Sequence, residues 1–202
     1  MSFSFLPKTV YQTKSKINGE IVVKEHLSQY TLQVQNLTQS GGIIKNIWQK
    51  PLKKIFKANQ VLILGLGGGT VVQLIKERFP EAKITSLEID QEIIKIGKKY
   101  FGLGKVKGLE IINEDAIKWI KNYQENKFDL ILVDMYVGGR FPQKAMENEF
   151  LQKLKKILTP QGKIVLNWLK NKSEGRLFEK LEKSFAQIEE VNTPTNLFFF
   201  CY

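Results

Sequence analysis

The sequence predicts an α/β protein with a mostly parallel sheet, helices on both faces of it, and a small N-terminal β-hairpin. Three observations support this prediction. From residue 61 onward, strand-like segments alternate with single helix-like segments, which requires crossovers between parallel strands. Residues 61–65 form a continuous apolar run, as in a strand buried on both faces. Two short β-prone runs precede residue 40.

Residues 1–58 are predicted to form the hairpin and a connecting helix. The β-prone runs are residues 20–25 and 30–35, which flank a four-residue turn. Beyond Gly41-Gly42, apolar residues recur at helical spacing, namely Ile43, Ile44, Ile47, Trp48 and Leu52. Pro51 lacks an amide hydrogen, so we expect the helix to kink or break there.

Residues 59–202 are predicted to form the main sheet and its helices. The expected strands are residues 61–65, 83–88, 109–113, 128–134 and 163–168, with a terminal pair at 185–191 and 197–202. The expected helices are residues 70–78, 90–100, 115–122, 143–158 and 173–185. Pro80 closes the first of these helices, and Pro160-Gln161-Gly162 ends the fourth.

The composition excludes several classes of protein. Of the 202 residues, 43% are hydrophobic and 25% charged, which is ordinary for a globular protein and excludes a disordered chain. With one cysteine, Cys201, and one histidine, His26, neither a disulfide framework nor a cysteine or histidine metal site is predicted. The longest apolar run is too short to cross a bilayer, and the first eight residues do not resemble a signal peptide. We therefore expect a cytoplasmic protein that does not bind membranes.

The net charge of +11 leaves two interpretations open. Residues 1–60 carry nine lysines against two glutamates, so the excess is greatest there. Only three of the 31 basic residues are arginine, whose planar guanidinium is favoured in the recognition of phosphates and bases. A solvated lysine-rich surface is the simpler interpretation. A nucleic-acid partner for the lysine-rich N-terminal segment is the other.

The clearest motif is the sequence Leu-Gly-Leu-Gly-Gly-Gly-Thr at residues 64–70, between a strand and a helix. Glycines there permit positive φ angles and close approach to a ligand, and a helix start offers free amides. Glu88 ends the next strand, 23 residues after Gly65, where a carboxylate can accept both hydroxyls of a ribose. The alternative is a packing turn beside a surface glutamate.

Two further acids follow strands in the same way. Asp115 follows the third strand of the alternating region and Asp134 ends the fourth. Because ligands of open α/β sheets bind outside the carboxyl ends of the strands, Gly65, Glu88 and these acids predict a nucleoside-like ligand at that edge. Each acid alone could instead cap a helix, and for Asp115 that alternative stays open.

The sequences VLILGLGGGT, ITSLEID, INEDAI, LILVDMY and PQGKIVLN, within residues 61–168, together resemble the class I S-adenosylmethionine-dependent methyltransferases. The resemblance is greatest to their spermidine synthase, or polyamine aminopropyltransferase, branch, which carries a small N-terminal β domain. It implies a Rossmann-like three-layer sandwich and S-adenosylmethionine, or its decarboxylated form, as cofactor. The implied cofactor contacts are Gly65, Gly67 and Gly69 at the methionine part, Glu88 at the ribose, Asp115 and Ala116 at the adenine, and Asp134 beside the sulfonium. Gly68 and Ile89 are further implied cofactor-binding residues.

The sequence departs from that branch at three places. The acid of its first glycine loop is missing, and Gly68 or Gly69 stands nearby. The second aspartate after its fourth strand, which deprotonates the attacking amine, is replaced by Val137. Its Tyr-His-Glu segment has no counterpart, and residues 39–42 stand in that region. Because a polycationic substrate needs several carboxylates, these departures favour methyl transfer to an unidentified acceptor over aminopropyl transfer.

The implied chemistry needs a nucleophile held in line with the electrophilic carbon, and a base if that nucleophile carries a proton. Asp134 is the first candidate for this catalytic role and Tyr136 the second; the alternatives are a strand-end cap and a partly buried aromatic. Residues 137–142 are predicted to form a mobile loop over the site. Arg140 in this loop either meets an anionic acceptor or is solvated.

Three functions therefore compete. The first is a methyltransferase acting on a small-molecule acceptor, and the second is a polyamine aminopropyltransferase. The third is a non-catalytic or nucleic-acid-binding module. A nicotinamide dehydrogenase is disfavoured because Thr70 stands where its third glycine is expected. Pairing of exposed hairpin edges would give a homodimer.

Overall fold

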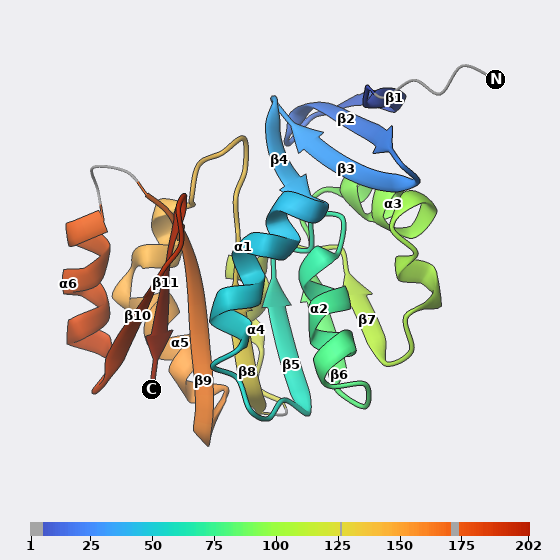
Figure 1. Cartoon of the computed structure of the whole chain (residues 1–202). Helices are drawn as coiled ribbons and strands as arrows, with labels where there is room; N and C mark the ends of the chain where they lie inside the picture. The colour runs from blue at the N-terminus through green and yellow to red at the C-terminus, as the bar shows by residue number, and fades with distance from the viewer. Residues whose placement is uncertain (1–5, 126, 171–173) are drawn as a thin grey trace.

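The computed structural model describes residues 6–125, 127–170 and 174–202, and it confirms the predicted α/β fold (Figure 1). The main sheet has the strand order β10-β11-β9-β8-β5-β6-β7. Its strands are β5 (Gln60–Leu64), β6 (Lys83–Leu87), β7 (Leu109–Ile112), β8 (Phe128–Val133), β9 (Leu158–Leu169), β10 (Ile188–Asn192) and β11 (Asn196–Cys201). Strands β5 to β9 pair in parallel, while β11 is antiparallel to β9 and to β10. The sheet is therefore mostly parallel, with an antiparallel pair at one edge.

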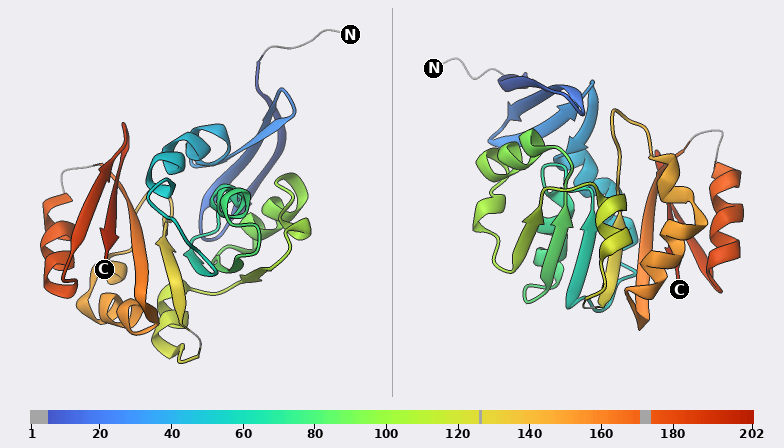
Figure 2. Two further views of the ribbon diagram at one scale, coloured as in Figure 1. Left: turned by 60° about the horizontal axis from the view of Figure 1, so that its bottom comes forward. Right: turned by 180° about the vertical axis from the view of Figure 1, so that it is seen from behind.

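Helices cover both faces of this sheet (Figure 2). One face packs against α1 (Gly42–Leu52), α2 (Thr70–Arg78) and α3 (Gln91–Tyr100), and the other against α4 (Ala116–Asn122), α5 (Asn148–Lys156) and α6 (Glu174–Ser184). Successive strand residues point to opposite faces, so Leu62 enters one core cluster and Ile63 the other. Both are fully buried, which explains the continuous apolar run of β5.

The predicted N-terminal hairpin is part of a larger structure, a four-stranded antiparallel sheet. Its strands are β1 (Lys8–Ser15), β2 (Gly19–His26), β3 (Gln29–Val34) and β4 (Leu37–Ser40). The outer strands were not predicted because both are largely polar and sit at the sheet edges. The β2–β3 turn is also shorter than expected: only Leu27 and Ser28 connect the paired His26 and Gln29, and both have positive φ angles.

The N-terminal sheet lies over α3 at the upper edge of the main sheet (Figure 1). Its buried face, which includes Ile21 and Leu32, packs against Ile93 and Ile96 of α3. Ile94 of the same helix belongs to the core of the main sheet. Helix α3 therefore joins the two sheets and fixes the N-terminal sheet above the carboxyl ends of the parallel strands.

Two predicted elements need correction. The helix expected at 143–158 is a 3-10 turn, η2 (Gln143–Met146), followed by α5, because the extended backbone of Glu147 separates them. A second 3-10 turn, η1 (Leu103–Lys105), follows α3. The strand expected at 163–168 begins earlier, since the chain around Pro160 continues β9 with an irregularity in its pairing to β8. The expected start of the last helix at residue 173 lies outside the described residues.

Among the described residues, none of the helices has the length and apolar character needed to span a membrane. Within the same residues, no group of three or more His, Cys, Asp or Glu is arranged to hold a metal ion.

Candidate active site

A cavity of about 250 Å³ lies at the carboxyl ends of β5, β6 and β8, under the N-terminal sheet. Four acids line it, namely Glu88, Glu114, Asp115 and Asp134, and no lysine, arginine or histidine is among the described residues of its lining. The predicted residues that line it are Gly65, Gly67, Glu88, Ile89, Asp115, Ala116, Asp134 and Tyr136. Gly68 and Gly69 are not among the lining residues. The ionisable side chains of the described lining, apart from Tyr136, are therefore all acidic.

The four glycine amides of the loop all donate hydrogen bonds within the protein, whereas the free amides expected at the helix start stay a prediction. The amide of Gly65 donates to the Leu87 carbonyl and that of Gly69 to the Leu66 carbonyl. The amide of Gly67 donates to the Glu88 carboxylate at 3.3 Å, and that of Gly68 to Ser40 Oγ at 2.7 Å. The loop amides are therefore used to build the site rather than left for a ligand.

Gly65 is required by a close backbone approach. Its φ of +96° is in a region that side chains rarely adopt, and a Cβ atom there would lie 2.2 Å from the Asp134 carbonyl oxygen. The close approach brings the ends of β5 and β8 together. Asp134 is thereby placed directly beside the glycine loop.

Glu88 is buried at the end of β6, and its carboxylate is held by backbone donors. Oε1 accepts from the Asp90 amide at 2.9 Å, and Oε2 accepts from the Gly67 amide. Burial raises the pKa of Glu88 to about 7, with a smaller contribution from the charge of Asp90, although the amides of Asp90, Gly67 and Leu66 favour the charged form. Glu88 also lines the cavity, so the acceptor capacity that these amides leave is available to a ligand.

This raised pKa predicts a pH-dependent loss of stability. The unfolded chain releases the Glu88 proton near the ordinary pKa of 4.5, whereas the folded chain holds it to about 7, so the free energy of unfolding falls as pH rises between these values. One pKa unit corresponds to about 1.4 kcal/mol, so the loss is about 3 kcal/mol. Urea unfolding at several pH values should show this decline for the wild-type chain relative to Glu88→Gln, which lacks the titrating carboxyl at position 88 and keeps all the others. Parallel profiles of the two proteins would contradict the assignment.

Asp134, at the end of β8, is held from two sides. Trp48 Nε1 donates to Oδ2 at 3.2 Å, and Asn167 Nδ2 donates to Oδ1 at 2.7 Å. The Asn167 oxygen in turn accepts from Asn196 Nδ2 at 2.7 Å. Burial raises the pKa of Asp134 to about 6, close to the range in which a carboxylate works as a general base.

Tyr136 lines the cavity, but its hydroxyl is held by the backbone of β9. It donates to the Asn167 carbonyl at 3.1 Å and accepts from the Leu169 amide at 2.8 Å. Burial raises the pKa of the hydroxyl above its ordinary value. These contacts fix the tyrosine ring beside Asp134. For a catalytic role, the hydroxyl would have to give up one of these two hydrogen bonds for a hydrogen bond to the substrate.

Asp115 caps α4, since its side chain accepts from the Ile117 amide at 2.8 Å, and it also lines the cavity. The capping interpretation of Asp115 is therefore confirmed, and its contact with a ligand stays a prediction. Asp90 caps α3 in the same way and also accepts from Asn18 Nδ2 at 2.8 Å. Asp90 thus connects the N-terminal sheet to the segment that carries Glu88.

Val137 and Pro142, the two ends of the segment 137–142, belong to the cavity lining. The segment makes a tight turn in which Val137 and Arg140 exchange two backbone hydrogen bonds of 3.0 Å. Gly138 and Gly139, both with positive φ, approach the side chains of Gln35 and Leu37. The turn therefore packs against the N-terminal sheet. The predicted mobility of this loop stays a prediction.

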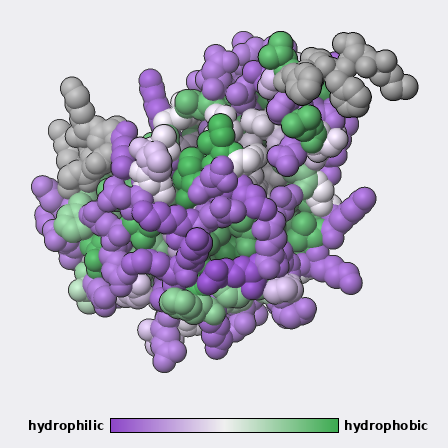
Figure 3. Space-filling model, viewed as in Figure 1, coloured by the Kyte–Doolittle hydropathy of each residue, from purple (hydrophilic) through white to green (hydrophobic). Residues whose placement is uncertain are grey.

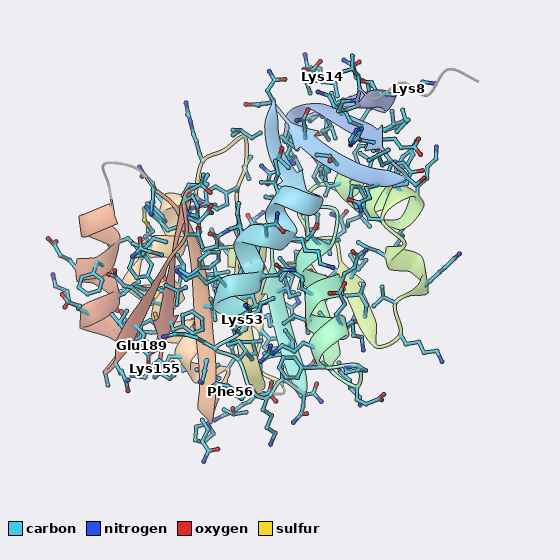
Figure 4. All side chains as sticks on the ribbon, in the orientation of Figure 1. Lys8, Lys14, Lys53, Phe56, Lys155 and Glu189 are labelled. Carbon is cyan, nitrogen blue, oxygen red and sulfur yellow. The ribbon has the colours of Figure 1, made fainter. Side chains whose placement is uncertain are left out.

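The lysines of the N-terminal segment lie at separate places. Lys8 and Lys14 are on the N-terminal sheet, whereas Lys53 follows α1 at the other end of the molecule (Figure 4). Lys45 pairs with Glu77 and Lys54 with Glu189, each at 2.8 Å. These five lysines are thus spread over separate parts of the molecule, and two of them are paired with glutamates.

Several residues of the site were not predicted, and Asn18, Ser40, Trp48 and Asn167 are the ones that hold its parts in place. Ser40 is the link between the N-terminal sheet and the glycine loop, since its hydroxyl accepts from Gly68. Asn167 had a usable signal, because it is a polar residue within the apolar strand sequence Ile-Val-Leu-Asn-Trp-Leu. The sequence gives no sign that Trp48 belongs to the site, because its position on a helical apolar face indicates core packing alone.

Comparison with known proteins places this geometry in a family. The profile of the spermine/spermidine synthase domain matches residues 44–200. The polyamine aminopropyltransferase of Prochlorococcus marinus (strain MIT 9301) is 31% identical over 172 residues, which are 72% of this chain and 59% of that protein. The human eEF1A lysine and N-terminal methyltransferase is 30% identical over 118 residues, 53% of this chain and 17% of that protein.

The chain spans less than two thirds of the length of these curated relatives, and only 38% of the polyamine aminopropyltransferase of Vibrio vulnificus (strain CMCP6). Among solved structures, a probable spermidine synthase from Corynebacterium glutamicum superposes with a TM-score of 0.81 at 16% identity, covering 97% of this chain and 80% of that one. Human methyltransferase-like protein 13 in complex with SAH gives a TM-score of 0.66 at 23% identity, covering 78% of each chain. These likenesses support the fold.

Proposed function

The chain belongs to the spermine/spermidine synthase domain family, and from that premise we propose that it is an S-adenosylmethionine-dependent transferase, a methyltransferase acting on a small molecule. One observation carries the proposal. The cavity brings together the buried carboxylates of Glu88 and Asp134 and contains no basic side chain in its described lining. Such a lining suits a nucleoside with a positively charged sulfur.

The residues of the cavity divide between the parts of this cofactor. Glu88 accepts the ribose hydroxyls through its free lone pairs. Ile89, Ala116 and Ile117 provide an apolar surface for a purine near the Asp115 carboxylate. Asp134 lies at the other side of the cavity, where a carboxylate stabilises a nearby sulfonium. When bound, S-adenosylmethionine supplies an electrophilic methyl carbon.

The protein's own part in the reaction is to orient the acceptor, remove its proton and exclude water. Asp134 is fixed by Trp48 and Asn167, so its carboxylate meets the nucleophile in one orientation. Its raised pKa improves its basicity. The turn at residues 137–142 covers the cavity mouth and limits the entry of water.

Aminopropyl transfer is the second candidate, and two observations favour it. The family and several relatives are named for that reaction. The cavity also offers no cationic side chain in its described lining for the carboxylate of intact S-adenosylmethionine. Against it, Gly68 leaves the loop without a carboxylate, and Val137 stands where the family's second aspartate is expected.

Isothermal titration with S-adenosylmethionine and its decarboxylated form separates the two candidates. For a methyltransferase we expect the intact cofactor to bind more tightly than the decarboxylated one, with NAD as the negative control. The reverse order would replace methyl transfer with aminopropyl transfer. Failure of both to bind would contradict the transferase proposal itself.

A further inference from the structure

A second cavity, of about 190 Å³, lies on the other side of Asp134. It shares Gln39, Asp134 and Tyr136 with the first cavity and is otherwise formed by β4, α1, the end of β9 and the start of β11. The Asp134 carboxylate therefore lies between two cavities. A molecule in the second cavity reaches the cofactor cavity at this residue.

The walls of the second cavity are mainly apolar. The apolar residues that line it are Leu37, Ile43, Ile44, Ile47, Trp48 and Leu169. Of these, Ile43 is 63% exposed and Leu37 45% exposed, which places them at the opening. Figure 3 shows hydrophobic surface in the upper centre of the view, where β4 meets α1 in Figure 1.

Asp134 is the single charged side chain among the described residues of this lining. The remaining polar groups are neutral, and several already hydrogen-bond one another. Asn196 donates to Asn167 and accepts from Thr195 Oγ1 at 2.6 Å, and both Tyr136 hydroxyl contacts are to backbone. Asp134 has taken one donor on each oxygen and keeps further acceptor capacity. The side chains of Thr38 and Gln39 add neutral polar groups, so Asp134 remains the one charged partner that this lining offers a bound molecule.

We propose that the second cavity binds the acceptor, and that the acceptor is a small molecule with an uncharged apolar body and a single amine or hydroxyl nucleophile. This inference rests on the proposed function. A diamine would place its second ammonium among isoleucines without a counter-charge, which is costly. The volume suits a small body, since a cavity of about 150 Å³ holds benzene.

The methyl transfer needs only the acceptor, S-adenosylmethionine and Asp134. The nucleophile's nitrogen or oxygen forms a bond to the methyl carbon of S-adenosylmethionine. The bond from that carbon to sulfur breaks, and its electron pair stays on the sulfur. The proton that leaves the nucleophile passes to the Asp134 carboxylate.

Two amines of equal size test the substrate class: 1-aminopentane carries one ammonium, and 1,4-diaminobutane carries two. Binding to the ¹⁵N-labelled protein saturated with S-adenosylhomocysteine can be followed through the indole N–H signal of Trp48, which lines the cavity and is assigned with Trp48→Phe. We expect the monoamine to bind about tenfold more tightly or better, because its far end is a methyl group. Equal or tighter binding of the diamine, or no binding of the monoamine, would overturn the inference.

A substitution at the opening should reverse this preference. Ile43 is exposed, so Ile43→Glu adds a carboxylate without disturbing the core, and Ile43→Gln is its uncharged match. We expect the glutamate variant alone to gain affinity for 1,4-diaminobutane. Binding of S-adenosylhomocysteine to the protein tests the proposed function on its own. If that compound does not bind, the proposed function fails, and the two amines can still be titrated into the protein without S-adenosylhomocysteine.

Discussion

Replacing Glu88 with alanine is expected to weaken the binding of S-adenosylmethionine about 100-fold or more. The substitution removes the acceptor of both ribose hydroxyls, and a hydrogen bond to a charged group contributes about 1.5–3 kcal/mol. Two such bonds correspond to about two orders of magnitude in affinity. Isothermal titration at pH 8, above the pKa of about 7, keeps the wild-type carboxylate ionised.

Glu81→Ala is the matched control for this experiment, because Glu81 is an exposed acid that does not line the cavity. Its affinity should equal that of the wild-type protein. Thermal unfolding of Glu88→Ala shows whether the fold survives the loss of contacts to the Gly67 and Asp90 amides. A folded Glu88→Ala protein with unchanged affinity would contradict the assigned role.

Replacing Asp134 with asparagine is expected to lower the rate of methyl transfer about 10²- to 10⁴-fold, the usual contribution of a general base. The rate is measured with labelled S-adenosylmethionine and 1-aminopentane as acceptor. The affinity for S-adenosylhomocysteine should change much less, because the ribose contact at Glu88 is retained. We also expect a lower melting temperature, because the new amide nitrogen faces the Trp48 or Asn167 donor.

Asp129→Asn provides the control on the same strand. Asp129 lies near the other end of β8, where it accepts from the amides of Asn59 and Gln60. This variant loses the same charge far from the cavity and should retain the wild-type rate. Equal rates for the wild-type protein and a folded Asp134→Asn protein would exclude Asp134 as the base.

The main sheet could be predicted because its strands are buried on both faces and read as apolar runs. The outer strands of the N-terminal sheet could not, since β1 is mostly polar and its pairing with β2 depends on contacts that no local pattern records. The split near Glu147 was missed for a similar reason. One residue with extended backbone interrupts a sequence that is otherwise helical in pattern.

The site was partly predictable because strand ends in a parallel sheet converge at one edge. Gly65, Glu88 and Asp134 follow from that rule alone. The residues that hold them come from elsewhere: Ser40 from the N-terminal sheet, and Trp48 from α1. Their roles arise from tertiary contacts between distant segments, so sequence spacing does not reveal them. The second cavity depends on the same contacts.

Crystals soaked with S-adenosylhomocysteine provide the most direct test of the central claim. We expect electron density in the acid-lined cavity, with both ribose hydroxyls within hydrogen-bond distance of the Glu88 carboxylate and the sulfur facing Asp134. An empty cavity in crystals of a protein that binds the compound in solution would contradict the claim, as would a ribose bound away from Glu88.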